Sequence, residues 1–249
     1  MKSNLCLHCG AFAVDREALA RAQTPEETDT FKPISHRQLF EGVVSSVEGI
    51  GWRVVGESHA LNEATDKYFG LLQVEPNDEE DGDHGFVIGL RNAHNRRMAA
   101  GLTFGSVVFV CDNMAFSGTI TVFRKHTKHL HEDLPERVRR AVEALPAVSE
   151  AINQRFVGYR QSEISDVNAH DIIIRALDEG VIGTNQIPVV LQEWRTPRHP
   201  EFADDGKTAW RLFNAFTEAL KETSIWNTAN RGIAFQALFD RCVSNYKNW

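Results

Sequence analysis

The order of local patterns along the chain limits its fold most strongly, because β-rich segments fill one half and helical periodicity fills the other. Strands are predicted where β-branched and aromatic residues gather, over residues 52–61, 67–76, 86–94, 106–113 and 119–126. Strands followed by helices predict an α+β fold and argue against an alternating parallel one. We expect an antiparallel sheet of about five strands in the N-terminal half, packed by helices, and a mostly helical C-terminal half.

Apolar residues at helical spacing lie on both sides of these strands. Ser35 is a predicted N-cap, and the helix after it should end at Gly49 and Gly51. Asp133, with Pro135 just inside, predicts the start of a long helix in which Pro146 would introduce a kink. Further helices are predicted around residues 167–180, 187–194, 206–220 and 232–246.

A change of composition near Ser35 predicts two regions. Residues 1–34 are polar and rich in turn-forming residues, and we interpret them as an N-terminal arm with one short helix. Residues 35–249 are expected to form a single α+β domain, sheet-rich over 35–131 and helical over 132–249. The acidic, glycine-containing segment 77–85 predicts an exposed hairpin tip or loop.

The sequence has no stretch that suits a membrane or a secretory signal. No window approaches 18 consecutive apolar residues, and the N-terminus lacks a sustained apolar run. Four cysteines are too few for a disulfide framework in a chain of 249 residues. We therefore expect an intracellular, cytoplasmic protein with no membrane partner.

The segment "CLHCG" contains half of a zinc-binding motif. Cys6 and Cys9 have the CxxC spacing, with His8 between them, but no second CxxC exists in the chain. The favoured interpretation is an ordinary reduced pair of thiols, with a metal site as the alternative.

The segment "RKHTKHLH" raises the same question with histidines. His126 and His129 share a helical spacing, whereas His129 and His131 share a strand spacing, so no single regular conformation presents all three. A solvated loop or strand end that attracts anions is favoured over a metal site.

Catalytic motifs are lacking. Nothing resembles a phosphate-binding glycine loop, a nucleophile elbow or an HExxH helix. Asp112 is the single acid between Arg91 and His131, and it is interpreted as a turn residue that ends a strand. We predict no catalytic residue, no bound metal and no cofactor, and consider an enzyme the less favoured class.

Charge is strongly segregated along the chain. The net charge is -7, yet residues 91–131 carry six cations against Asp112, a local balance of +5, which leaves -12 for the rest. If the predicted strands pair, two basic segments lie near the same end of the sheet and form a strip that attracts a phosphate backbone. The six predicted nucleic-acid contacts are Arg91, Arg96, Arg97, Arg124, Lys125 and Lys128.

Two further observations bear on this strip. Phe116, Phe123 and Tyr68 could offer stacking surfaces for unpaired bases, although aromatic residues in strands are more often core. The alternative interpretation is a charged edge strand that prevents aggregation.

Several segments together resemble a known family. "FGLLQV", "GLRNAHNRRMAAGLTFG", "VFVCDNMAFSG", "FRKHT" and "KTAWRLFNAFTEALKE" resemble the phage- and plasmid-associated family described as domain of unknown function 932, from about Ser35 to the end. The order of strands and helices and the basic segment are also remotely similar to the single-strand annealing superfamily. That resemblance implies a curved antiparallel sheet, ring-shaped homo-oligomers and binding of unpaired DNA.

The sequence thus supports one favoured function and two alternatives. The favoured one is a nucleic-acid-binding protein of a mobile element, with single-stranded DNA as partner. The first alternative is a protein-interaction module, such as a counter-defence factor, that engages a host protein through the 77–85 loop, Trp226 and Trp249. The second is a metal-assisted hydrolase that uses the three histidines and Asp112.

Overall fold

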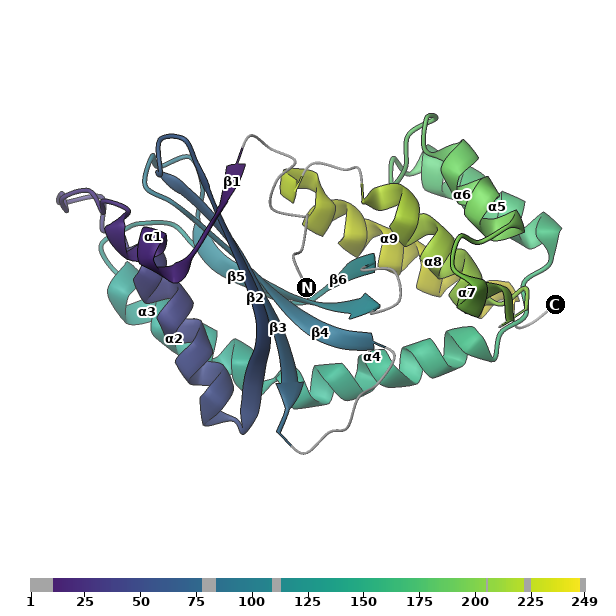
Figure 1. Cartoon of the computed structure of the whole chain (residues 1–249), viewed down its shortest axis with the longest axis horizontal. Helices are drawn as coiled ribbons and strands as arrows, with labels where there is room; N and C mark the ends of the chain where they lie inside the picture. Colours follow the sequence, from purple (N-terminus) through teal and green to yellow (C-terminus); the bar gives the residue numbers. More distant parts are fainter. Residues whose placement is uncertain (1–10, 78–83, 109–112, 205, 222–224, 247–249) are drawn as a thin grey trace. The chain divides into compact units, whose positions relative to one another are not determined.

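The computed structural model describes residues 11–77, 84–108, 113–204, 206–221 and 225–246, and it has the expected α+β architecture (Figure 1). One sheet holds six strands, each next to its neighbours in sequence. The strands are β1 (Ala11–Val14), β2 (Trp52–Asn62), β3 (Lys67–Pro76), β4 (His84–Ala93), β5 (Ala100–Val108) and β6 (Asn113–Arg124).

The helices lie mostly in the C-terminal half, as expected. The first two, α1 (Arg16–Arg21) and α2 (His36–Gly49), precede β2. The others follow β6: α3 (Leu130–Glu143), α4 (Leu145–Arg160), α5 (Asp166–Asp178), α6 (Ile187–Arg195), α7 (Pro200–Asp204), α8 (Ala209–Leu220) and α9 (Ile225–Tyr246).

The sequence-based prediction of the sheet missed strand residues at two places. β1 lies within the predicted arm and pairs antiparallel with the end of β2, with Ala11 opposite Asn62. The strand predicted over 106–113 is wrong in its bounds, because β5 begins at Ala100 and β6 begins at Asn113. Glycines 101 and 105 lower the strand propensity of this segment, which hid its first half. Cys111 and Asp112 lie outside the described residues.

The long helix predicted from Asp133 is two helices. It begins three residues earlier, at Leu130, and Asp133 lies in its first turn. Ala144 ends α3, and Pro146 is the second residue of α4, where the missing N–H of proline removes no helical hydrogen bond. The predicted kink is therefore a break between two helices.

The chain divides into two compact units. Unit 1 comprises Met1–Gly105 and Thr119–Ala147, and unit 2 comprises Ser106–Gly118 and Val148–Trp249. In unit 2, an aromatic core joins α4, α8 and α9: the Phe156 ring lies 4.8 Å from that of Trp210, and the Phe213 ring lies 5.1 Å from that of Phe235. Aromatic pairs at these separations add attraction beyond the burial of their area.

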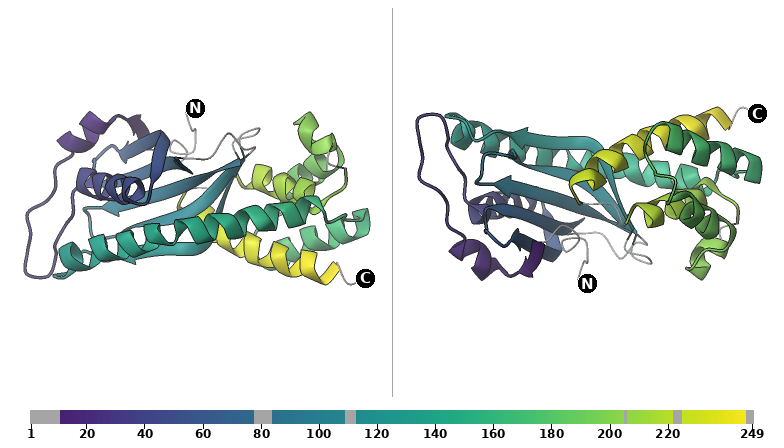
Figure 2. Two further views of the ribbon diagram at one scale, coloured as in Figure 1. Left: turned by 90° about the horizontal axis from the view of Figure 1, so that it is seen from below. Right: turned by 90° about the horizontal axis from the view of Figure 1, so that it is seen from above.

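In unit 1, α2 and α3 lie on the same side of the sheet (Figure 2). Ser35 caps α2 as predicted: its hydroxyl accepts from the Gln38 N–H at 3.0 Å, and the Gln38 side chain accepts from the Ser35 N–H at 3.2 Å. This capping box begins the helix at His36, which is fully buried against the sheet. α2 therefore places His36 against Asn92 and His94 at the end of β4, and we call these three buried side chains the polar core.

Within the described residues, none of the helices is long and apolar enough to span a bilayer.

Candidate nucleic-acid interface

The six predicted contact residues come from two segments, the region from β4 to the start of β5 and the region from the end of β6 to α3. The structure brings three of them around one pocket and holds two others in separate contacts. Lys128 is exposed and forms no ion pair with a described residue.

The guanidinium of Arg91, on β4, packs on an aromatic ring. Its guanidinium carbon lies 3.6 Å from the centre of the Phe123 ring of β6, a cation–π geometry. Gly101 of β5 makes room for this contact, because a Cβ there would lie 2.7 Å from a Phe123 ring carbon. Burial lowers the pKa of Arg91 from its ordinary value. Arg91 is therefore held within the sheet.

Arg124 is occupied by an acid. Its guanidinium donates to a carboxylate oxygen of Asp133, in the first turn of α3, at 2.5 Å. The pair is partly exposed, and it neutralises a charge that the sequence assigned to phosphate contacts.

Arg96 and Arg97 lie in the connection between β4 and β5, and side-chain bonds fix that connection. Asn95 donates to an Asp66 carboxylate oxygen at 2.9 Å and accepts from the Arg97 N–H at 3.1 Å. Arg96 has a left-handed backbone with φ 64°, which is uncommon outside glycine. Its guanidinium carbon lies 4.6 Å from the centre of the Phe31 ring.

Lys125 follows β6 and completes a hollow of about 290 Å³ that we call the cationic pocket. Three cations contribute to its wall, and no acidic side chain does among the described residues that line it. Lys125 and Arg97 are exposed and form no ion pair with a described residue. The lining residues are Thr30, Phe31, Arg96, Arg97, Met98, Ala99, Lys125, His126 and Thr127.

The three histidines of "HTKHLH" lie in different environments. His126 lines the cationic pocket and is only 6% exposed; neither ring nitrogen meets hydrogen-bond geometry with a described residue, and the nearby Lys32 backbone raises the pKa of the ring against the effect of burial. His131 contacts a Glu27 carboxylate oxygen at 3.0 Å, and His129 contacts Glu132 at 3.3 Å. The prediction of a solvated strand end is therefore wrong for His126, whose ring packs 5.4 Å from that of Phe31.

His126 belongs to a wider group of buried histidines in unit 1. The rings of His36 and His94 stack at 4.1 Å, and both contact backbone oxygens, of Thr65 at 3.1 Å and of Ile34 at 2.9 Å. Burial, with a smaller contribution from the nearby His94, lowers the pKa of His36 and of His126 to about 4. The imidazoles of His36 and His126 are therefore neutral near pH 7.

Sequence reasoning missed the contribution of the arm. Thr30 and Phe31 line the cationic pocket because the Lys32 N–H donates to the His126 carbonyl at 3.1 Å, which ties the arm to the end of β6. Phe31 is 5% exposed. The signal available in the sequence was an aromatic residue in an otherwise polar segment, because such a side chain favours burial.

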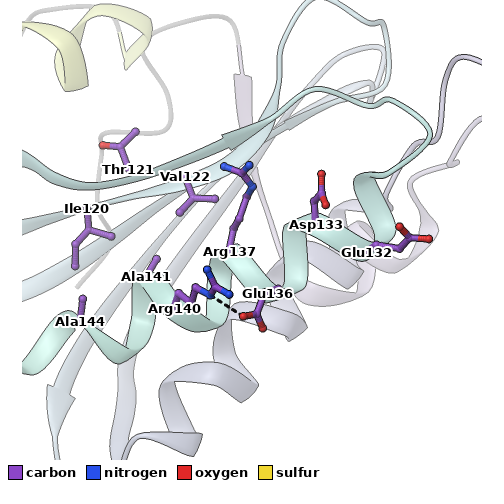
Figure 3. Close-up of a pocket in the computed structure, with 10 residues that line it drawn as sticks. All are labelled: Ile120, Thr121, Val122, Glu132, Asp133, Glu136, Arg137, Arg140, Ala141 and Ala144. Carbon is purple, nitrogen blue, oxygen red and sulfur yellow. Dashed lines mark hydrogen bonds and ion pairs between the residues drawn. The ribbon is translucent and has the colours of Figure 1, made fainter.

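A larger hollow of about 680 Å³ lies between β6 and α3 (Figure 3). Its lining carries both signs of charge, and its Glu136 accepts from the Arg140 Nε at 2.6 Å, the dashed contact in Figure 3. Arg137 extends from α3 toward β6. The mixed charge makes this hollow a weaker candidate for a polyanion than the cationic pocket.

No group of three or more metal-binding side chains occurs within the described part of the chain. Cys6, His8 and Cys9 lie outside it, as do Trp249 and most of the 77–85 loop. The side chains of Phe116 and Trp226 are likewise not described. Tyr68 is fully buried, so it offers no stacking surface.

Comparison with known families identifies the family of this chain. The model for "Domain of unknown function (DUF932)" matches residues 27–237. The chain belongs to this family. The match covers the part of the arm that lines the cationic pocket, strands β2 to β6 of the sheet and most of the helices of this DUF932 chain. No curated protein and no solved structure matches it.

Proposed function

We propose that this protein binds nucleic acid through the cationic pocket, with unpaired DNA as its partner. The single observation that carries this proposal is the convergence of Arg96 and Arg97 with Lys125 around one hollow without an acidic wall. Neutralising phosphates with such side chains releases condensed counterions, which favours binding. The proposed role needs no catalytic residue.

The biological setting that we propose is a mobile element, such as a phage or plasmid, where the protein would bind or anneal single strands during recombination. Three cations make a small contact, so we propose that several copies act together in a homo-oligomer. Linked contacts on one strand raise the overall affinity without any new contact.

The proposal is tested by removing Arg97 and Lys125, the two exposed pocket cations that form no ion pair with a described residue. Arg97→Ala with Lys125→Ala should weaken binding of a single-stranded oligonucleotide about tenfold or more at low salt. The slope of log K against log salt should become less steep by roughly 0.7 for each lost contact. Fluorescence anisotropy at four salt concentrations measures both quantities.

The matched control is Arg21→Ala with Arg195→Ala, which removes the same charge from exposed residues outside the pocket. The control should retain the wild-type slope. Equal affinities and slopes for the two double variants would refute the pocket as the binding site.

A protein-interaction role is the second candidate, because α5 exposes two apolar side chains. Val167 is 76% exposed and Ile174 is 50% exposed, and their spacing of seven places them on one helix face. Capture of a host protein that is lost in Val167→Asp with Ile174→Asp, together with no binding of DNA, would favour this role.

A further inference from the structure

The predicted strip of positive charge is interrupted in the structure, and this changes the ligand that it suits. A DNA strand that crosses the sheet would need a row of cations to contact its successive phosphates. Two cations of that row are already engaged, because Arg91 packs on Phe123 and Arg124 pairs with Asp133. Three of the four remaining cations, Arg96, Arg97 and Lys125, surround a single hollow. Such an arrangement suits an anion concentrated at one point better than an extended track of phosphates.

The wall of the cationic pocket offers more than charge. Thr30 and Thr127 contribute hydroxyl groups, which can donate hydrogen bonds to phosphate oxygens. His126 contributes a buried imidazole whose nitrogens do not meet hydrogen-bond geometry with any described residue, and leaving a buried polar group unsatisfied is unfavourable. An anion in the pocket would offer this ring a hydrogen-bond acceptor.

The local backbone holds one wall in place. Arg96 has φ 64°, and such conformations of non-glycine residues gather at ligand sites, where the surrounding structure enforces them. The Phe31 ring supports one face of its guanidinium. The carboxylate of Glu27, which could compete for these cations, is taken up by Lys32 at 2.7 Å and by His131 at 3.0 Å.

Size and charge then distinguish two forms of phosphate. A diester within a strand carries one negative charge, and its chain must leave the site in two directions. A terminal monoester carries nearly two negative charges and three acceptor oxygens on one group. A hollow of about 290 Å³ holds such a group with part of its nucleoside, and it is too small for a duplex.

We propose that the cationic pocket binds a phosphate monoester of a nucleotide, either at the end of an unpaired strand or on a free mononucleotide. This inference rests on the proposed function because it uses the same pocket, and it adds the form of the ligand. Arg97 and Lys125 supply the charge, and Thr127 and His126 supply polar contacts to the terminal oxygens.

The test compares strands that differ in one group. Single-stranded 12-mers carrying a 5′-phosphate, a 3′-phosphate or two hydroxyl ends, each labelled away from the varied end, are titrated by anisotropy. Adenosine monophosphate and adenosine serve as competitors, and inorganic phosphate measures the effect of the anion alone. At least one phosphorylated strand should bind about tenfold more tightly than the hydroxyl strand, and adenosine monophosphate should compete where adenosine does not.

Two variants connect the preference to the pocket. Arg97→Ala with Lys125→Ala should remove the preference for the phosphorylated end. Thr127→Val, which keeps the shape of the side chain but not its hydroxyl, should reduce the preference several-fold. An unchanged preference in both variants would overturn the assignment to this pocket.

The outcomes separate the inference from the proposed function. If all strands bind equally and the double variant weakens them all, the inference fails and the proposed function stands. If no strand binds but direct titration shows that adenosine monophosphate does, the inference stands and the proposed function fails. If neither binds, both fail.

Discussion

At the scale of single residues, glycines decide whether the sheet can hold its large side chains. A Cβ at Gly101 would lie 1.8 Å from the Val122 carbonyl oxygen, and one at Gly70 would lie 2.2 Å from the Tyr68 hydroxyl. Both separations are far below van der Waals contact. Gly101 thus permits the close approach of β5 and β6 on which the Arg91–Phe123 contact depends, and Gly70 permits the Tyr68 hydroxyl to reach His59 at 3.0 Å.

Substitution of Gly101 tests this directly. Gly101→Ala should lower the free energy of unfolding by about 3 kcal/mol, because backbone must move to admit the methyl group. Gly42→Ala is the matched control: a Cβ added at this position of α2 would have nothing within 4 Å, so the change should raise stability by roughly 0.5–1 kcal/mol. Urea unfolding followed by circular dichroism measures both, and equal effects would contradict the close approach.

At the scale of elements, the sequence specified α2 well and the end of the sheet poorly. The α2 boundary was predictable because a capping box is local, confined to Ser35 and Gln38. The start of β5 was not predictable, because its first half contains Gly101, and glycine is needed there only because β6 lies too close to admit a side chain. The same limit applies to the site: charge along the chain located the cations, but their partners, Phe123 and Asp133, are set by tertiary contacts.

The cap of α2 should stabilise the polar core because it fixes the start of the helix at His36, which packs against the sheet. Ser35→Ala removes the acceptor for the Gln38 N–H and should lower the free energy of unfolding by about 1 kcal/mol. Ser35→Asp is the control, since a carboxylate can accept the same hydrogen bond and should retain most of the stability. Thermal unfolding measures the change, and equal losses in both variants would show that the cap is unimportant.

At the scale of the whole molecule, the buried histidines connect stability to pH. His36 and His126 are 0% and 6% exposed, and the pKa of each is lowered to about 4 by burial and by His94. Asp66 opposes the shift at His36, and His131 adds to it at His126. The arm, α2 and the connections after β4 and β6 therefore pack around His36 and His126, which are neutral in the folded protein near pH 7.

The direction of the effect follows from proton binding. The unfolded chain binds protons at these histidines near pH 6.5, whereas the folded chain does so only near pH 4, so stability is complete above pH 6.5 and falls as the pH is lowered toward 4. By pH 5 each histidine should cost about 2 kcal/mol of unfolding free energy. Urea unfolding between pH 4.5 and 7.5 measures this loss. His126→Leu should make the dependence on pH shallower, whereas His170→Gln, at an exposed position of α5, should leave it unchanged. Equal pH dependence in wild type and His126→Leu would show that His126 is not held neutral by the fold.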